Sequence, residues 1–249
     1  MVNREMSGTN AVVTGAGRGF GRAISHSLAR AGVHVVGVGR TAQPLQELKD
    51  ELGNNFTIEV ADVAAPFTAK RLLGSYRPQT VVLNAGATPV AAPLLDQTWD
   101  NFSRNWAVDV HQVFNFTREA LAAPLPSGAA VIAMSSGAAL RGSPLSGGYA
   151  GAKATIRFIS EYAASEAARN ALGVRFVAVL PQITPETDLG SIFVKAYARH
   201  AGVDVNTYLS QLGPRLSLEQ VGQSITELTT NGEYTASAYL LNGNGLSPL

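Results

Sequence analysis

Three residues of this sequence have the types and spacing needed to move a proton to or from a carbonyl or alcohol oxygen: Ser136, Tyr149 and Lys153. Tyr149 and Lys153 are four residues apart, so on a helix they share one face. An ammonium within ~4–6 Å of a phenol favours the phenolate and lowers the phenol's pKa from about 10. A serine hydroxyl at the end of the preceding strand would hold the carbonyl oxygen meanwhile. Tyrosine and lysine fall four apart on many helices, so this interpretation also needs Ser136 and a hydride source.

A glycine-rich stretch near the start of the sequence offers a place for a nucleotide that carries the hydride. Residues 10–14 form a short β-branched run, and the pattern Thr14-Gly15-x-x-x-Gly19-x-Gly21 leads into a helical stretch that ends at Gly32. In this context glycines let the backbone approach a pyrophosphate, and the helix N-terminus offers amide donors. The spacing differs from Gly-x-Gly-x-x-Gly, and a glycine-rich turn without a ligand is the alternative.

Two arginines predict which nucleotide would bind. An acid about 20 residues after such a glycine motif usually bonds the ribose 2′-hydroxyl. Here Gly39 has that place, Arg40 follows it, and Arg18 lies inside the glycine loop. A guanidinium binds a phosphate through two parallel hydrogen bonds and keeps its charge. We therefore expect a 2′-phosphate, and hence NADP(H); two solvated surface arginines are the alternative.

The elements that must position these residues alternate along the chain. Strands are expected at residues 10–14, 33–38, 56–60, 80–83, 129–134, 174–180 and 238–241; those at 33–38, 80–83, 129–134 and 174–180 are expected to be buried. Helices are expected at about 23–31, 44–52, 98–122, 149–170 and 216–229, the last with Ser217 as its N-cap. This alternation predicts a doubly wound α/β Rossmann fold, with a mostly parallel, seven-stranded sheet and helices on both faces.

Residues 181–214 are the least regular part of the sequence, because aliphatic and aromatic residues are mixed there with polar ones. Such a mixture is typical of a mobile lid over a ligand, and we expect a lid-like segment at about 185–214. A plain surface helical hairpin is the alternative. The sequence has no internal repeat or linker, which predicts a single domain over residues 1–249.

Composition narrows the range of partners. The 249 residues are 46% hydrophobic and carry a formal net charge of +1 without basic or acidic blocks, which argues against nucleic acid and anionic membrane. The absence of cysteine fits a reducing cytoplasm. The first five residues lack the apolar core of a signal peptide, and no apolar run approaches the roughly 20 residues of a membrane helix.

Two other kinds of catalytic site are not expected. The four histidines are scattered and have no metal-ligand spacing; they are His26, His34, His111 and His200. We therefore predict no metal site. No Gly-x-Ser-x-Gly motif surrounds Ser136, which argues against a Ser/His/Asp hydrolase.

Taken together, these residues resemble the short-chain dehydrogenase/reductase family, of the compact single-domain kind. The resemblance runs from Thr14 to about Gly245, with the motifs in the family's order. It implies that Asp62 and Val63 hold the adenine and that Asn84-Ala85-Gly86 is the motif after the fourth strand. The cofactor-binding residues that it implies are Gly15, Arg18, Gly19, Phe20, Gly21, Arg40, Asp62, Val63, Asn84, Ala85, Gly86, Tyr149, Lys153, Pro181 and Thr184.

The resemblance also implies roles for the residues that move the proton. Tyr149 would be the general acid in reduction and the base in oxidation, Lys153 would make the phenol more acidic and bind the nicotinamide ribose, and Ser136 would orient the carbonyl. The cofactor carries the hydride. Basic residues like Arg18 and Arg40 accompany an NADP preference in the family. We therefore expect an NADP(H)-dependent oxidoreductase that reversibly reduces a ketone or aldehyde that is not highly charged.

Three positions depart from the family pattern. Asp109 stands where the family usually has an asparagine that supports a water chain to the lysine. Gln182 follows Pro181 in place of a glycine, and Asn242-Gly243-Asn244 replaces the ending Asp-Gly-Gly. We expect Asp109 to be part of the catalytic set and to keep the relay working, since a carboxylate also accepts hydrogen bonds from water. Its charge would raise the pKa of Lys153.

These departures leave other functions open. A nucleotide-binding member with little turnover, acting as a sensor or structural partner, is the second interpretation. An NAD-dependent alcohol dehydrogenase is the third, and Gly39 and Arg40 disfavour it. The family's habit of packing two long helices against a second copy implies a homo-oligomer, a tetramer or a dimer. Small residues on the helix after Tyr149 fit that packing, but would serve an intramolecular core equally; they are Ala152, Ala163, Ala164 and Ala167.

Overall fold

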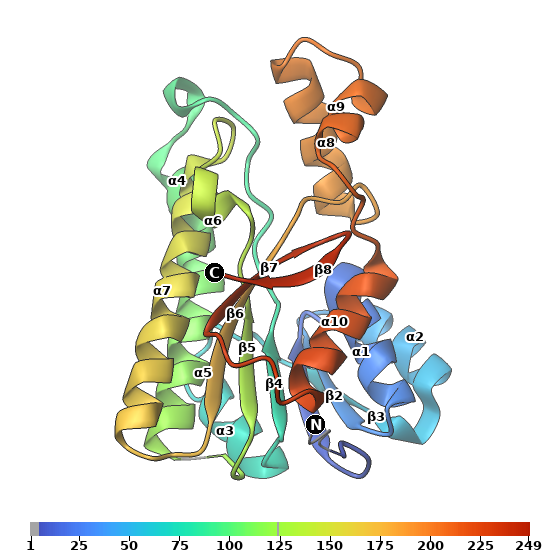
Figure 1. Ribbon diagram of the computed structural model, residues 1–249, viewed down its shortest axis with the longest axis vertical. Coiled ribbons are helices and arrows are strands. Elements are labelled where there is room, and N and C mark those ends of the chain that lie inside the picture. The colour runs from blue at the N-terminus through green and yellow to red at the C-terminus, as the bar shows by residue number, and fades with distance from the viewer. Residues whose placement is uncertain (1–4, 124) are drawn as a thin grey trace.

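The computed structural model describes residues 5–123 and 125–249. Its centre is an eight-stranded sheet with the strand order β3-β2-β1-β4-β5-β6-β7-β8 (Figure 1). Seven strands are parallel: β1 (Asn10–Thr14), β2 (His34–Gly39), β3 (Phe56–Val60), β4 (Thr80–Leu83), β5 (Ala130–Met134), β6 (Arg175–Pro181) and β7 (Ala238–Asn242). The predicted Rossmann-like fold and its seven parallel strands are confirmed.

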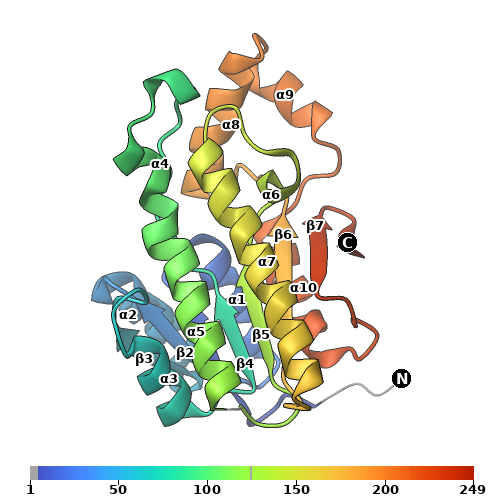
Figure 2. The same ribbon diagram turned by 90° about the vertical axis from the view of Figure 1, so that its left-hand side faces the viewer.

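Helices cover both faces of this sheet (Figures 1 and 2). One face is covered by α1 (Gly19–Arg30), α2 (Ala42–Leu52) and α10 (Leu218–Thr230), and the other by α3 (Thr68–Tyr76), α5 (His111–Ala122) and α7 (Gly147–Arg169). Four more helices lie beyond the carboxyl ends of the strands, namely α4 (Trp99–Asn105), α6 (Ala138–Arg141), α8 (Asp188–His200) and α9 (Val205–Gln211).

The central strands of the sheet contribute to two apolar layers, as β1 shows. Val13 faces the layer under α1 and α10, and its neighbour Val12 faces the layer under α5 and α7; both are fully buried. This alternation explains why the strands read as continuous hydrophobic runs, since a parallel sheet is buried on both faces. Gly37 on β2 has a packing reason as well, because a Cβ there would lie 2.0 Å from the Phe56 ring.

The helix expected at residues 98–122 is interrupted. Between α4 and α5 the chain forms a π-helical turn, η3 (Trp106–Val110), which contains Asp109. Thr98 caps α4 by accepting a hydrogen bond from the Asn101 backbone N–H (3.3 Å). The apolar pattern of an α-helix continues through the turn, so the π-helical turn could not be predicted from it.

Two segments differ from their expected structure. The region expected to be irregular, 181–214, contains the two helices α8 and α9, as in the helical hairpin considered as the alternative. The side chains of Thr187 and Asp204 cap their N-termini. An eighth strand, β8 (Gly245–Pro248), returns antiparallel to β7 after a turn in which Asn242 Oδ1 accepts from the Asn244 N–H (2.8 Å). The remaining short turns are η1 (Gly53–Asn55) and η2 (Leu94–Asp96).

Neither a signal peptide nor a membrane helix was expected from the sequence. Residues 1–4, which bear on the signal-peptide expectation, lie outside the described residues. Within the described part of the chain, no helix is both long and apolar enough to span a membrane.

Candidate active site

The carboxyl ends of four neighbouring strands gather the expected site residues. β1, β4, β5 and β6 are adjacent and parallel, so the segments after Thr14, Leu83, Met134 and Pro181 meet on one side of the molecule. The chain leaves β1 towards β2 and β3, whereas β4 begins the run in the opposite direction. This change of direction is where ligands bind in doubly wound sheets.

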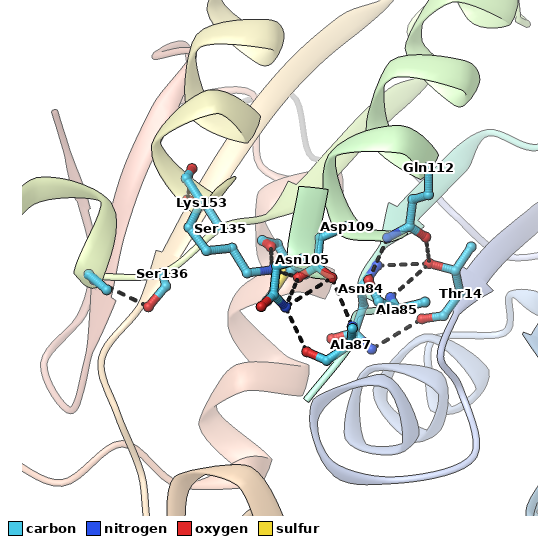
Figure 3. Close-up of polar contacts among 12 residues, drawn as sticks. Thr14, Asn84, Ala85, Ala87, Asn105, Asp109, Gln112, Ser135, Ser136 and Lys153 are labelled. Atoms are coloured by element: carbon cyan, nitrogen blue, oxygen red, sulfur yellow. Dashed lines mark hydrogen bonds and ion pairs between the residues drawn. The ribbon is translucent and has the colours of Figure 1, made fainter. Parts of the chain in front are cut away.

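Tyr149 and Lys153 lie in the first two turns of the long helix α7, and the helix was predicted from their spacing. The Lys153 ammonium lies 5.5 Å from the centroid of the Tyr149 ring. Ser135 Oγ donates to the Lys153 carbonyl oxygen (2.7 Å) and so ties the end of β5 to α7. Ser136 is half-buried in the turn that follows, where its Oγ accepts from the Ala138 N–H (3.2 Å). Figure 3 shows how Ser135, Ser136 and Lys153 lie.

The Lys153 ammonium forms a buried ion pair. Its Nζ lies 3.2 Å from Asp109 Oδ2 and donates to the Met134 carbonyl oxygen (2.9 Å). Lys153 is 6% exposed and Asp109 is 1% exposed. Burial alone would lower the pKa of Lys153, but the charge of Asp109 acts in the opposite direction and the pKa is raised. The direction expected from the sequence is therefore confirmed.

Asp109 is held in place by contacts from two other segments (Figure 3). Its Oδ1 accepts from the Ala87 N–H (2.8 Å), and the Asn105 side-chain amide lies 3.3 Å from each carboxylate oxygen. The Asn105 amide also donates to the Ala87 carbonyl oxygen (2.7 Å). A Cβ at Gly86 would lie 2.8 Å from Asp109 Oδ2, so the carboxylate occupies space that only glycine leaves open.

Thr14 links the glycine loop to the segment after β4 (Figure 3). Its Oγ1 accepts from the backbone N–H groups of Asn84 (2.8 Å) and Ala85 (3.1 Å), and donates to Gln112 Oε1 (2.8 Å) on α5. The Asn84 side chain donates back to the carbonyl oxygens of Thr14 (3.1 Å) and Gly15 (3.3 Å). These contacts fix the position of the loop in which a nucleotide was expected.

The glycine loop and α1 fit a nucleotide phosphate. A Cβ at Gly21 would lie 2.1 Å from the Gly15 carbonyl oxygen, and Gly15 and Gly19 have positive φ angles of 66° and 51°. Within the described chain no side chain caps the N-terminus of α1, and its first turn, which contains Phe20, has no acidic residue. Backbone donors at an uncapped helix N-terminus are an anion-binding arrangement. The residues present therefore suit the pyrophosphate of a dinucleotide.

Charged side chains lie around the region expected for the adenosine half. Arg40 is exposed directly after β2, and Arg18 Nη1 lies 3.8 Å from Asp188 Oδ2 at the start of α8, with both side chains exposed. Asp62 is exposed after β3 and accepts from the Ala64 N–H (2.9 Å), while Val63 is buried. Neither arginine is committed to a buried contact, so both remain available to a phosphate.

The segment after β6 lies beside the turn that carries Ser136. The Pro181 carbonyl oxygen accepts from the Gly137 N–H (3.0 Å). The Gln182 side chain donates to the Leu212 carbonyl oxygen (2.6 Å), so it holds the far end of the α8–α9 pair. Thr184 is buried, and its hydroxyl accepts from the Glu186 N–H (3.4 Å).

Comparison with known proteins identifies the family. The model of the family described as short chain dehydrogenase matches residues 9–196, about three quarters of the chain. The chain belongs to the short-chain dehydrogenase/reductase family. It is therefore an oxidoreductase of carbonyl or alcohol substrates with a nicotinamide nucleotide as cofactor.

Individual relatives of this short-chain dehydrogenase/reductase are distant. It is 29% identical to an L-xylulose reductase of Mesocricetus auratus over 163 residues, which cover 65% of this chain and 66% of the relative. It is 27% identical to a 12alpha-hydroxysteroid dehydrogenase of a Clostridium species over 210 residues, covering 78% and 80%. A carbonyl reductase [NADPH] 2 of Sus scrofa is 34% identical over 112 residues, covering 45% and 46%.

Solved structures agree with the fold of this short-chain dehydrogenase/reductase. An NAD+-bound xylitol dehydrogenase superposes with a TM-score of 0.83 at 19% identity, covering 96% of this chain and all of the other. A putative NAD(P)-dependent gluconate 5-dehydrogenase from Beutenbergia cavernae with bound NADP superposes with a TM-score of 0.80 at 24% identity, covering 96% and 97%. At these identities the similarity concerns the fold alone.

Sequence reasoning missed three polar residues near the site of this short-chain dehydrogenase/reductase. Asn105 contacts Asp109, Gln112 contacts Thr14, and the Tyr197 hydroxyl is hydrogen-bonded to Ser143 Oγ. The last contact joins α8 to the loop that precedes α7. Asn105 is four residues before Asp109, so their helical spacing was a signal; the other two depend on chain segments that meet only in the fold.

The small residues of α7 serve the intramolecular core, the second of the two uses considered from the sequence. Ala152, Ala163 and Ala167 on α7 are buried within the chain, and Ala164 is partly buried against the same apolar layer as Ala163 and Ala167. They pack inside the molecule, so they do not support contact with a second copy. Among the described residues there is also no cluster of three or more His, Cys, Asp or Glu side chains that would hold a metal ion.

Proposed function

We propose that this protein is an NADP(H)-dependent oxidoreductase that reversibly converts a ketone or aldehyde into the corresponding alcohol. The observation that carries the proposal is the buried Lys153 ammonium, held 5.5 Å from the centroid of the Tyr149 ring at the carboxyl ends of the strands. When bound, the nicotinamide cofactor supplies the hydride for reduction and accepts it in oxidation. The proton is left to the side chains of the chain itself.

The proposed proton donor to the carbonyl oxygen is the Tyr149 hydroxyl. Ser136, half-buried in the turn after β5, would donate a hydrogen bond to the same oxygen and so orient it. Lys153 would favour the phenolate that remains after the transfer. Asp109 would hold Lys153 in its charged form and in place, since the ion pair is buried and fixed at both ends.

The cofactor would be held by the residues expected from the sequence. The loop at 15–21 and the N-terminus of α1 would bind the pyrophosphate, and the segments at 62–63 and 84–86 would lie against the adenosine half. Tyr149 and Lys153 would bind the nicotinamide ribose, and Pro181 and Thr184 would lie on the nicotinamide side. The support for this assignment is the uncapped N-terminus of α1 and the close approach at Gly21.

The proposed preference for NADP(H) rests on Arg18, Arg40 and the absence of an acid at Gly39. Both arginines are exposed, and Arg18 has only a solvent-exposed partner at 3.8 Å. Hydrogen bonds to charged groups contribute about 1.5–3 kcal/mol each. Two such bonds to a 2′-phosphate exceed the ~1.4 kcal/mol that a tenfold preference requires.

Calorimetric titration with NADPH and with NADH tests this preference. We expect NADPH to bind at least about tenfold more tightly, and the double change Arg18→Ala plus Arg40→Asp to lower or reverse the ratio. Equal dissociation constants in the wild type would rule out the NADP assignment. Assays with a panel of ketones and aldehydes that are not highly charged then test the reaction.

A second candidate function is a nucleotide-binding protein with little turnover. The observation that favours it is the direct pairing of Asp109 with Lys153, which offsets the positive charge beside Tyr149. Tight NADPH binding without reduction of any carbonyl would support this candidate. Activity of the wild type would exclude it.

Four further assignments are also proposals: a lid, a homo-oligomer, a single domain and a cytoplasmic location. The helices α8 and α9 would act as a lid, because the Tyr197 hydroxyl ties them to the loop before α7. The protein would form a homodimer or homotetramer through the exposed aromatic side chains of α5 and α7. A single-domain organisation and a cytoplasmic location follow from the sequence arguments and stay predictions.

A further inference from the structure

The buried amide of Asn105 belongs to the polar cluster around Lys153. Its Nδ2 lies 3.3 Å from both Asp109 Oδ1 and Asp109 Oδ2 and donates to the Ala87 carbonyl oxygen (2.7 Å). The side chain is 1% exposed. A single amide nitrogen therefore faces three acceptor oxygens from two different segments of the chain (Figure 3).

The orientation of this amide is determined by its surroundings. Turning it over would place the Asn105 carbonyl oxygen against the same three acceptors, which is repulsive. In the orientation observed, Asn105 Oδ1 is buried and has no hydrogen-bond partner among the described residues. An unpaired buried acceptor is destabilising. The Asn105 amide keeps this orientation because its N–H groups bond the Asp109 carboxylate and the Ala87 carbonyl oxygen.

Among the described residues, the one cation paired with the Asp109 carboxylate is Lys153. Asp109 on η3 and Tyr149 on α7 are the titratable groups that act on the Lys153 charge, while β5 presents only the neutral Met134 carbonyl oxygen. The Asp109 carboxylate, 3.2 Å from the ammonium, offsets part of the effect that the ammonium has on a neighbouring group. The Tyr149 ring, 5.5 Å from Lys153 Nζ, is such a group.

We propose that Asn105 is a positioning residue that holds the Asp109 carboxylate against Lys153, and that the resulting neutral pair keeps Tyr149 in its proton-donating form to higher pH. This inference rests on the proposed function, because it concerns the same proton transfer. A neutral residue at position 109 would leave the ammonium uncompensated and would favour the phenolate. The ion pair thus favours reduction, which needs Tyr149 as an acid, over oxidation, which needs Tyr149 as a base.

Four variants separate this role from a general loss of stability. Asn105→Leu keeps a side chain of similar size and removes the donors, Asp109→Asn removes the charge, and the double variant combines them. Asn10→Leu is the matched control. Asn10 donates to the Tyr76 carbonyl oxygen (2.9 Å) from the start of β1, at the opposite ends of the strands, so this variant loses a hydrogen bond far from Lys153.

The first measurement is the pH dependence of alcohol oxidation with NADP+, whose midpoint reports formation of the base. In Asp109→Asn the midpoint should fall by about one pH unit or more, which is tenfold in the proton equilibrium. Asn105→Leu should shift it in the same direction. In the Asp109→Asn background, Asn105→Leu should add no further shift, because its effect passes through the carboxylate. Asn10→Leu should leave the midpoint unchanged.

The second measurement does not need turnover. The NMR signal of the Lys153 side chain, assigned by its loss in Lys153→Met, is followed with pH. It should lose its proton at lower pH in Asp109→Asn and in Asn105→Leu than in the wild type. An unchanged lysine titration in Asn105→Leu would overturn the proposal. So would a shift of the oxidation midpoint by Asn105→Leu that is as large in the Asp109→Asn variant as in the wild type. NADPH binding without any turnover would instead refute the proposed function, and the lysine titration would still decide the role of Asn105.

Discussion

Lys153 is the residue on which the polar contacts of the site converge. Its ammonium contacts the Met134 carbonyl oxygen and Asp109, and its own carbonyl oxygen accepts from Ser135 Oγ. The first two contacts use two of the three N–H donors of the ammonium. Lys153 therefore has a fixed position, which a group needs if it is to act on the neighbouring phenol.

Tyr149→Phe tests the proton donor most directly. The substitution removes only the hydroxyl, so the fold and NADPH binding should survive. Carbonyl reduction should fall by about 10²–10⁴-fold, the usual contribution of a positioned general acid. Steady-state kinetics with any accepted carbonyl, together with calorimetric NADPH binding, measure both quantities. A variant that reduces the carbonyl as fast as the wild type would show that Tyr149 is not the donor.

Asp109→Asn should change how stability depends on pH. In the wild type the pKa of Lys153 is raised above its unfolded value of about 10.4. The resulting stabilisation is fully present below that pH and is lost as pH rises through the raised pKa. Without the carboxylate, burial is left to lower the pKa of Lys153 in the folded state. The unfolded state would then bind more protons just below pH 10.4, so the variant should gain stability as pH approaches that value.

Denaturant unfolding from pH 7 to pH 10 measures this change, with wild type and variant compared at each pH so that other groups cancel. The difference in unfolding free energy between the two proteins should narrow as pH rises. A difference that is constant over this range would mean that Asp109 does not control the charge of Lys153.

At the scale of elements, the π-helical turn η3 is the feature that carries Asp109. A π turn contains one residue more than an α turn, and one residue corresponds to a rotation of about 100° about the helix axis. The turn therefore changes which side chains of the helix face the carboxyl ends of the strands. With it, Asp109 reaches both Lys153 on α7 and the Ala87 N–H after β4.

Gly86→Ala should displace Asp109 without unfolding the chain. The new Cβ would lie 2.8 Å from Asp109 Oδ2 and 3.1 Å from its Cγ, so the carboxylate must move. The hydrogen bonds between Thr14 and Asn84 involve neither Gly86 nor Asp109 and should persist. We expect carbonyl reduction to fall by about tenfold or more, which corresponds to ~1.4 kcal/mol of transition-state stabilisation.

The matched control for this change is Gly74→Ala on α3, where a Cβ would meet nothing within 4 Å. Alanine is favoured over glycine inside a helix by about 1 kcal/mol, so this variant should be at least as stable as the wild type and equally active. Full activity of Gly86→Ala would contradict the importance of the Asp109 position.

The sequence predicted the elements whose signals are local. Most of the parallel strands are buried apolar runs, and Ser217 caps α10 as expected, with Gln220 completing a capping box. The π turn was not predictable, because its apolar spacing continues that of α4 and α5. Strand β8 was not predictable either, since Gly245-Leu246-Ser247-Pro248 has no strand pattern and forms only by pairing with β7.

The same distinction applies to the candidate site. Ser136, Tyr149 and Lys153 were predicted from their spacing, because two of them share a helix and the third follows the end of β5. The ion pair of Asp109 with Lys153 was not found as a direct contact, and Asn105 was not found at all. Their partners come from α4, η3, α7 and the segment after β4, and only the folded sheet brings these together.

At the scale of the whole molecule, the outer faces of α5 and α7 expose several large aromatic side chains. Phe114 is 49% exposed, Phe158 is 49% exposed and Tyr162 is 68% exposed; the last two stack at a ring-centroid distance of 6.2 Å. The helices lie side by side, as Figure 2 shows. Clustered exposed apolar side chains are typical of protein–protein interfaces. They support the proposed homo-oligomer better than the buried alanines of α7.

The paired change Phe158→Glu plus Tyr162→Glu should reduce the oligomer to a smaller species, because buried unpaired charges are costly. Light scattering at micromolar protein concentration measures the mass of the wild type and of this variant. The control is Phe67→Glu, an equally drastic change at a side chain that is 81% exposed, outside α5 and α7. A monomeric wild type would rule out the homo-oligomer.

The antiparallel strand β8 has a consequence for how copies of the chain can meet. β8 pairs with the side of β7 that faces away from β6, so it is the edge strand here and has only four residues. Its last residue is Pro248, which has no backbone N–H to offer to another strand. Short edge strands that contain proline are poor templates for strand addition, and natural proteins use them against aggregation. A sheet that continues from one copy into the next is therefore disfavoured on this side, and self-association is directed to the helical faces.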